Sequence, residues 1–112
     1  MRILGIGVDV VQNKRIRSLI NNKNFINRTF GKNEVKLSKK ISNKTNYFAK
    51  RFAAKESLAK SLGTGFRNNL NFKDIEVLND KIGKPFFLES KKVSDIIRKK
   101  FNIKKFYLFL SI

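Results

Sequence analysis

Residues 43–63, NKTNYFAKRFAAKESLAKSLG, decide the fold, because they form the longest run of helical periodicity in the chain. Asn43 or Thr45 is expected to begin this helix, and Gly63 to end it as a glycine cap. Apolar residues recur on one stripe, with small residues beside them: Phe48, Ala49, Phe52, Ala53, Ala59 and Leu62. We therefore predict a long central helix with one face in the core.

The segments around this helix predict a mixed α/β fold. Strands are expected at residues 3–11, 72–78, 85–88 and 105–112, where β-branched and aromatic residues gather between turn signals. Shorter helical segments are expected at residues 12–20, 25–31, 33–40 and 90–101. The predicted architecture is an α/β fold of the α+β type, with the long central helix packed on a mainly antiparallel sheet.

Composition limits both the size and the chemistry of the protein. A chain of 112 residues predicts a single domain over residues 1–112. The sequence has no cysteine and no histidine, which excludes disulfides, thiolate metal sites and imidazole chemistry within these residues. A hard cation on oxygen ligands is the metal chemistry that remains.

The charge is strongly positive, with 26 Lys and Arg against 8 Asp and Glu and a formal net charge of +18. Such a charge attracts nucleic acid, anionic membranes, phosphorylated ligands or acidic proteins without choosing among them. A compositional bias toward Lys, Asn, Ile and Phe explains the excess equally well. Asp9 interrupts the short apolar N-terminal stretch, and 18 consecutive apolar residues occur nowhere, so we expect no membrane span and a cytoplasmic protein.

Two carboxylates stand out in this basic chain. Asp9 follows an apolar stretch predicted as a strand, and Glu56 lies within the long helix. Taken singly, Asp9 could bond to nearby backbone N–H groups, and Glu56 could pair with Lys60 one turn away. Because buried carboxylates need a partner or a metal, the two acids together predict a Mg²⁺ site.

Groups suited to binding phosphate surround Glu56 in the sequence. The cations on the same helix are Arg51, Lys55 and Lys60, and the Gly63-Thr64-Gly65 turn follows with backbone N–H groups. A solvated basic face and ordinary helix termination are the alternative explanations. The Gly5-Ile6-Gly7 pair lacks the third glycine of a dinucleotide-binding fingerprint, and we expect it to allow close backbone packing beside Asp9.

Several motifs occur together in a fixed order. They are Gly5-Ile6-Gly7-Val8-Asp9, Arg51-Phe52-Ala53-Ala54-Lys55-Glu56-Ser57, Gly63-Thr64-Gly65, Phe72-Lys73-Asp74-Ile75-Glu76-Val77 and Gly83-Lys84-Pro85. In this order the chain resembles the holo-(acyl-carrier-protein) synthase family of small 4′-phosphopantetheinyl transferases. The resemblance runs from residue 1 to about residue 88, and more loosely beyond.

The resemblance implies the 4′-phosphopantetheinyl transferase fold and a Mg²⁺-dependent reaction in fatty acid biosynthesis. The phosphopantetheine arm of coenzyme A would move to a serine of apo acyl carrier protein, releasing adenosine 3′,5′-bisphosphate. The resemblance implies Asp9 and Glu56 as metal ligands, Lys60 as a further catalytic residue, and a homotrimer. The positions it implies near coenzyme A are Arg51, Lys60, Gly63 and Thr64, and Arg15 would lie on the docking surface for the acidic carrier protein.

The chain also departs from the family pattern. The family continues through an S-x-S-H-E strand, whereas Ile112 stands about where its histidine would be, and Gln12 replaces a frequent acidic residue. We therefore expect a domain that lacks the last strand or strands. The alternative hypothesis is a weakened or inactive homologue that binds acidic protein or nucleic acid through charge. Nucleic acid is not favoured, because the sequence contains no recognisable reading motif.

Overall fold

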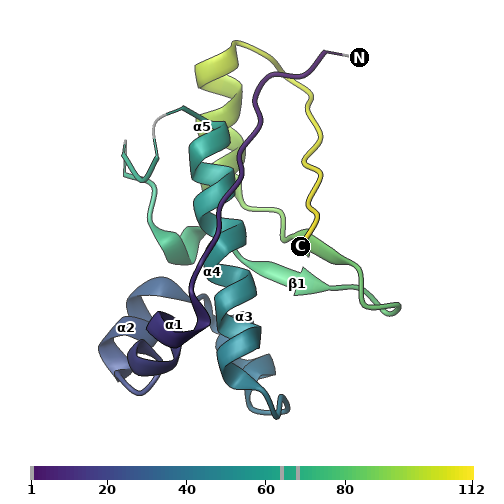
Figure 1. Ribbon diagram of the computed structural model, residues 1–112. Helices are drawn as coiled ribbons and strands as arrows, with labels where there is room; N and C mark the ends of the chain where they lie inside the picture. The colour runs from purple at the N-terminus through teal and green to yellow at the C-terminus, as the bar shows by residue number, and fades with distance from the viewer. Residues whose placement is uncertain (1, 64, 68) are drawn as a thin grey trace.

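The computed structural model describes residues 2–63, 65–67 and 69–112 (Figure 1). Their helices are α1 (Asn13–Leu19), α2 (Lys23–Thr29), α3 (Lys32–Ser38), α4 (Lys44–Ser61), the 3-10 helix η1 (Phe72–Asp74) and α5 (Lys91–Phe101). Their strands are β1 (Val77–Asn79) and β2 (Pro85–Phe87). The mixed α/β class predicted from the sequence is confirmed, with α4 as its central helix. No helix within the described ranges is long and apolar enough to cross a membrane.

The ends of α4 follow from its capping residues. The side chain of Asn43 accepts a hydrogen bond from the Asn46 backbone N–H at 3.1 Å, so Asn43 rather than Thr45 caps the helix. Gly63 adopts a φ of +77° just after the last turn, which glycine does without steric cost. Both predicted boundaries of the central helix are confirmed.

Two hydrophobic clusters pack against α4, one at each half of the helix. The cluster around its N-terminal half is rich in aromatic residues and contains Ile16, Phe25, Phe30, Tyr47, Phe48, Ala49 and Phe52. The cluster around its C-terminal half is aliphatic and contains Leu58, Leu62, Leu70, Ile75, Val93 and Ile97. Helices α1 to α3 gather at one end of α4, and α5 lies along the other end (Figure 1). The long helix therefore joins two small cores into one body.

The hairpin and α5 agree with the sequence prediction. Strands β1 and β2 pair in antiparallel fashion, with Val77 opposite Phe87 and Asn79 opposite Pro85. Pro85 takes the first position of its strand, where its missing N–H is tolerated. Ser90 caps α5 by accepting a hydrogen bond from the Val93 backbone N–H at 3.4 Å.

The strand predicted at residues 3–11 is wrong, although the chain there is extended. Most of its β-branched side chains are exposed, Val10 to 88%, whereas Val11 at its end packs on the aromatic cluster. The backbone instead lies against α4: a Cβ at Gly7 would come within 1.8 Å of the Ser57 carbonyl oxygen, and one at Gly5 within 2.1 Å of that of Ser61. The glycines thus allow close packing, as expected, and the segment approaches a helix instead of pairing with a strand.

Two further strand predictions need correction. The predicted strand at residues 72–78 begins instead with the turn η1, which is closed by a hydrogen bond from the Asn71 backbone N–H to the Asp74 carboxylate at 2.8 Å. Only residues 77 and 78 of the predicted strand belong to β1. Residues 105–112 are extended without regular strand pairing, and Phe109 is 81% exposed. Alternating apolar residues predict an extended backbone, but a β-strand also needs a neighbouring strand to form hydrogen bonds with.

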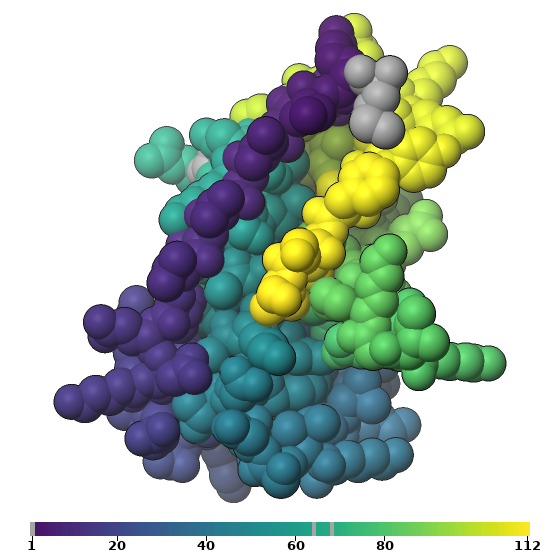
Figure 2. All heavy atoms as spheres, turned by 45° about the vertical axis from the view of Figure 1, so that its right-hand side comes forward, coloured from purple at the N-terminus to yellow at the C-terminus, as the bar shows by residue number. Residues whose placement is uncertain are grey.

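Both extended segments cross the same face of the molecule (Figure 2). A cavity of about 730 Å³ lies between them and is lined by both segments together with residues of α4 and α5. In the described part of the chain, regular pairing is confined to β1 and β2, so the sheet is smaller than the sequence predicts.

A buried ion pair connects the helices to the hairpin. Lys55 of α4 and Glu34 of α3 are both fully buried, with 2.6 Å between Lys55 Nζ and Glu34 Oε1. Lys55 also donates to the carbonyl oxygens of Phe72 and Ile75, so its three donors are satisfied. Glu34 accepts the backbone N–H groups of Gly31 and Val77, each at 2.9 Å. Four chain segments therefore meet at one pair of charges.

We predict that removing one partner of this pair destabilises the fold strongly. Lys55→Met or Glu34→Gln alone leaves a buried group without its partner, at a cost of about 3–5 kcal/mol. The double variant should lose less than the sum of the two single variants, because it leaves no unpaired charge. Urea unfolding followed by circular dichroism measures the difference.

The control is Lys91→Met, which removes an exposed pair with Asp95 at 3.9 Å and should leave the free energy of unfolding unchanged. Single variants at Lys55 and Glu34 that unfold like Lys91→Met would refute the structural role of the buried pair.

Candidate functional site

Asp9 meets α4 at the end of the extended N-terminal segment. The Lys60 ammonium donates to Asp9 Oδ1 at 2.5 Å and lies 3.4 Å from the carbonyl oxygen of Val8. The Asp9 side chain is 13% exposed and the Lys60 side chain 53% exposed. Within the described ranges, Lys60 pairs with Asp9, and not with Glu56 one turn before it. The ordinary helix pair considered for Glu56 is therefore not what the structure shows.

Glu56 faces the same region from α4. Partial burial raises the pKa of Glu56, and the negative charge of Asp9 raises it further. The positive charges of Lys60 and Arg15 act in the opposite direction. Because charges act on one another over short distances in a protein, these four side chains share one electrostatic environment. The hydrogen bond with Asp9 is the main cause that raises the pKa of Lys60.

The donor set suits a hard divalent cation. The positively charged Lys60 ammonium contacts oxygens of Asp9 and Val8, so these oxygens already bind a cation. Asp9 and Glu56 would hold Mg²⁺ through carboxylate oxygens, the ligands it prefers. No group of three or more acidic residues capable of holding a metal occurs in the described part of the chain. Mg²⁺ commonly binds through one or two carboxylates, with water and substrate phosphates as further ligands.

Lys55 does not join this site. We expected Lys55 to help frame Glu56, and that expectation is wrong, because Lys55 is buried against Glu34. The reason is helical geometry: positions 51 and 55 share one face of α4, and positions 56 and 60 share another.

Arg51 also points away from Glu56. Its guanidinium lies 3.7 Å from the centre of the Tyr47 ring and donates to Asn79 Oδ1 at 2.5 Å. Its Nε is buried and has no hydrogen-bond partner within the described residues. The structure therefore brings together Asp9, Glu56, Lys60 and Arg15 of the predicted site residues, and leaves Arg51 on the opposite face of α4.

The turn after α4 ends the helix and uses its own amides to do so. The Gly63 N–H donates to the Lys60 carbonyl oxygen at 2.9 Å, and the Gly65 N–H donates to that of Ala59 at 3.2 Å. The expectation that these two amides are offered to a phosphate is therefore wrong for this conformation. Thr64, the third residue of the predicted turn, lies outside the described residues.

Lys100 is a basic residue near this turn that was not predicted from the sequence. A Cβ at Gly63 would lie 3.3 Å from Lys100 Nζ, so the end of α5 places its ammonium beside the end of α4. The sequence offers no signal for this contact, since the packing of α5 on α4 creates it.

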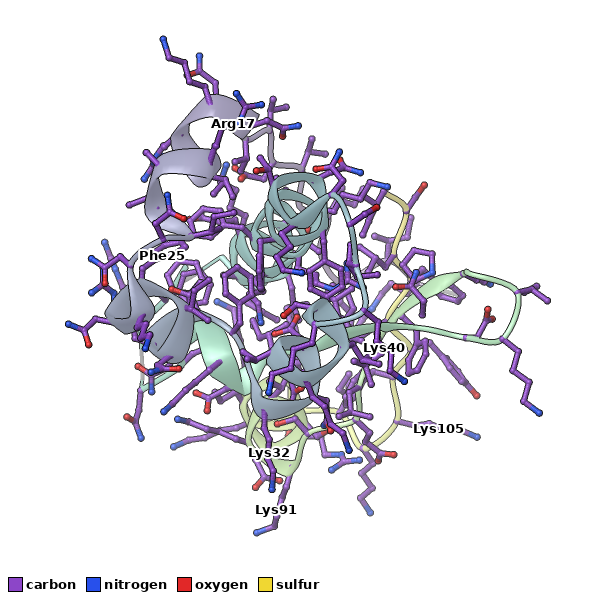
Figure 3. The ribbon with its side chains drawn as sticks, turned by 90° about the horizontal axis from the view of Figure 1, so that it is seen from below. Arg17, Phe25, Lys32, Lys40, Lys91 and Lys105 are labelled. Carbon is purple, nitrogen blue, oxygen red and sulfur yellow. The ribbon has the colours of Figure 1, made fainter. Side chains whose placement is uncertain are left out.

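Helix α1 presents basic residues beside the site. Ile16 is fully buried, while Lys14, Arg15 and Arg17 are exposed. Figure 3 shows Arg17 on the outer side of α1 and Phe25 directed toward the interior. Burial of Ile16 thus turns a cationic face of α1 toward solvent, and the charge of Arg15 on this helix acts on Glu56.

The class of the protein follows from a family model that matches most of the chain. Residues 5–106 match the model of the 4′-phosphopantetheinyl transferase superfamily, and the chain belongs to that superfamily.

The more specific likeness is to holo-[acyl-carrier-protein] synthases. The synthase of Pelagibacter ubique (strain HTCC1062) is 56% identical over 112 residues, which covers 100% of this chain and 88% of the relative. The crystal structure of the Neisseria meningitidis synthase has a TM-score of 0.81 and 36% identity, covering 93% of this chain and 84% of that one. The Bacillus anthracis synthase in complex with CoA (3′,5′-ADP) has a TM-score of 0.72 and 40% identity, covering 80% and 77%.

We predict that Glu56→Gln stabilises the metal-free protein. Because the pKa of Glu56 is raised in the folded state, its charged form costs stability above that pKa. The variant should raise the melting temperature at neutral pH by roughly 1–3 °C. The gain should vanish below pH 4.5, the ordinary glutamate pKa, where the carboxyl is neutral in both states.

Differential scanning calorimetry measures this shift, and Glu89→Gln, which changes an exposed carboxylate, serves as the control. A lower melting temperature for Glu56→Gln at neutral pH would contradict the electrostatic description of the site.

Proposed function

We propose that this protein transfers the 4′-phosphopantetheine group of coenzyme A to a serine of apo acyl carrier protein. The observation that carries the proposal is the meeting of Asp9, Glu56 and Lys60 in a member of the superfamily. High identity to a holo-[acyl-carrier-protein] synthase over the whole chain weighs against an inactive basic binding protein.

The reaction is a phosphoryl-group transfer. The serine oxygen forms a bond to the phosphorus that carries the pantetheine, the bond to the bridging pyrophosphate oxygen breaks, and adenosine 3′,5′-bisphosphate leaves. The serine hydroxyl must also lose its proton, and a nearby carboxylate would accept it. When bound by Asp9 and Glu56, Mg²⁺ would neutralise charge on the pyrophosphate and polarise the phosphate under attack.

The basic residues divide between two substrates in this proposal. Lys60 lies beside the carboxylates, where its ammonium can bind the pyrophosphate of coenzyme A. Arg51, Gly63 and Thr64 are assigned to coenzyme A by their place in the motifs alone, since the Arg51 guanidinium packs on Tyr47 on the opposite face of α4. Arg15, exposed on α1, would dock the acidic carrier protein, and the charge of +18 favours both anionic partners.

The proposal also covers the oligomeric state of the protein, its pathway and its compartment. Exposed apolar side chains line both extended segments, among them Ile3, Ile6, Val8, Val10, Tyr107 and Phe109. Extended backbone with apolar side chains is suited to pairing with another copy of the chain. In line with the family resemblance, we propose that such pairing forms a homotrimer, which acts in fatty acid biosynthesis in the cytoplasm.

The transfer assay tests the proposed activity. We expect apo acyl carrier protein to gain a label from a fluorescent coenzyme A when protein and Mg²⁺ are both present. Asp9→Ala and Glu56→Ala should each lower the rate by roughly 100-fold or more, because each removes a metal ligand.

Asp95→Asn removes an exposed carboxylate of α5 and should transfer at the rate of the unchanged protein. Full activity of Asp9→Ala or Glu56→Ala would refute their assignment, and a folded protein that never labels the carrier would refute the function.

Sedimentation velocity tests the trimer. We expect a species of three times the 13.0 kDa chain mass. Phe109→Asp should shift it toward the monomer, because a charge would have to be buried in the contact. Ile82→Asp, at the exposed hairpin tip, should leave the mass unchanged. A monomer at high concentration would contradict this assembly.

A further inference from the structure

The contact between Lys60 and Asp9 places an ammonium in the candidate metal site. Lys60 Nζ lies 2.5 Å from Asp9 Oδ1 and 3.4 Å from the Val8 carbonyl oxygen. A carboxylate oxygen and a backbone carbonyl oxygen are both ligands that a hard cation accepts. The lysine therefore occupies oxygens that a divalent cation would use.

The site needs a positive charge even without a metal. Asp9 is 13% exposed, Glu56 is partly buried, and the charge of one acts on the other. Two neighbouring carboxylates with little access to water repel each other, and a nearby cation relieves the repulsion. The cations that act on Glu56 are Lys60 of α4 and Arg15 of α1, and Lys60 is the one bonded to Asp9.

We propose that Lys60 is a stand-in cation, which holds Asp9 in the metal-free protein and leaves it when a divalent cation binds. This inference rests on the proposed function in one respect, since it takes Asp9 and Glu56 as the metal ligands. The released ammonium becomes available to phosphate at the same moment.

The surroundings of Lys60 allow this exchange. Its side chain is 53% exposed and ends on a flexible stem, so it can swing away without opening the core. Lys55, five residues earlier on the buried face of α4, shows the opposite arrangement, with no exposure and three hydrogen-bond partners. Of these two paired lysines of α4, one is fixed and the other is free to move.

The exchange also changes the charge of the site. With Lys60 on Asp9, the two carboxylates outweigh the single ammonium, and the cluster formed by these three residues is negative. With a divalent cation bound and Lys60 still nearby, the same cluster is positive and attracts a pyrophosphate. Binding of the metal and of an anionic ligand should therefore be mutually favourable.

The test measures Mn²⁺ binding without coenzyme A or carrier protein, by electron paramagnetic resonance of the free ion. Lys60→Met keeps the length of the side chain and removes its charge. We expect it to bind Mn²⁺ roughly fivefold more tightly than the unchanged protein, the fold-change that an exposed ion pair corresponds to. Lys60→Arg keeps the charge and should show no gain.

Arg15→Met is the matched control, because it removes a nearby charge that makes no ion pair with Asp9. Its gain in Mn²⁺ affinity should be clearly smaller than that of Lys60→Met. The metal-free Lys60→Met protein should also melt at a lower temperature than the unchanged protein, and Mn²⁺ should raise its melting temperature by more.

Three results would overturn the inference: no gain for Lys60→Met, equal gains for Lys60→Met and Arg15→Met, or no Mn²⁺ binding by any variant. Failure of the proposed function is distinguishable from these. If Lys60→Met gains Mn²⁺ affinity but the protein does not transfer phosphopantetheine, the stand-in role is supported and the proposed function is refuted. If the protein transfers phosphopantetheine but Lys60→Met shows no gain in Mn²⁺ affinity, the proposed function is supported and the stand-in role is refuted.

Discussion

The buried pair of Lys55 and Glu34 is the interaction on which the rest of the structure depends. Two charges removed from water are tolerated because their hydrogen bonds are satisfied, and those bonds reach the start of α3, the turn η1 and the start of β1. The pair fixes the rotation of α4 about its own axis. Once Lys55 faces inward, helical geometry turns Glu56 and Lys60 toward the N-terminal segment. One buried contact thus orients the face of α4 that carries the candidate site.

The N-terminal segment supplies the other half of that site through an equally simple constraint. Gly5 and Gly7 leave no side chain between this segment and α4, and the backbones approach closely enough to bring Asp9 to Lys60. A basic α1 follows directly after Asp9 and lies against α4. The proposed acidic site for a cation and the proposed basic surface for anionic partners therefore adjoin each other, which suits a transfer between coenzyme A and an acidic carrier protein.

The sequence predicted the elements whose signals are local. Asn43, Gly63 and Ser90 mark helix ends through their own side chains or backbone, and the structure confirms all three. The role of Lys55 was not predictable, because its partner Glu34 lies on another helix and the pairing depends on packing. The strand predictions at residues 3–11 and 105–112 were wrong for a related reason. An apolar pattern predicts an extended backbone, but a β-strand also needs hydrogen bonds to a neighbouring strand, and the pattern does not identify that neighbour. Asp9 and Glu56 were predicted as a pair because they are carboxylates in a strongly basic chain, and the family resemblance implied them and Lys60 as site residues; the contact between Asp9 and Lys60 is a property of the fold.

A crystal structure of the protein with coenzyme A and Mg²⁺ tests the central claim most directly. That claim is that the face of α4 fixed by Lys55 places Glu56 and Lys60 beside Asp9 to bind a cation and a pyrophosphate. The account predicts one ion held by oxygens of Asp9, Glu56 and the pyrophosphate, with Lys60 moved from Asp9 to a phosphate. A pyrophosphate bound elsewhere, with Lys60 still paired to Asp9, would contradict it.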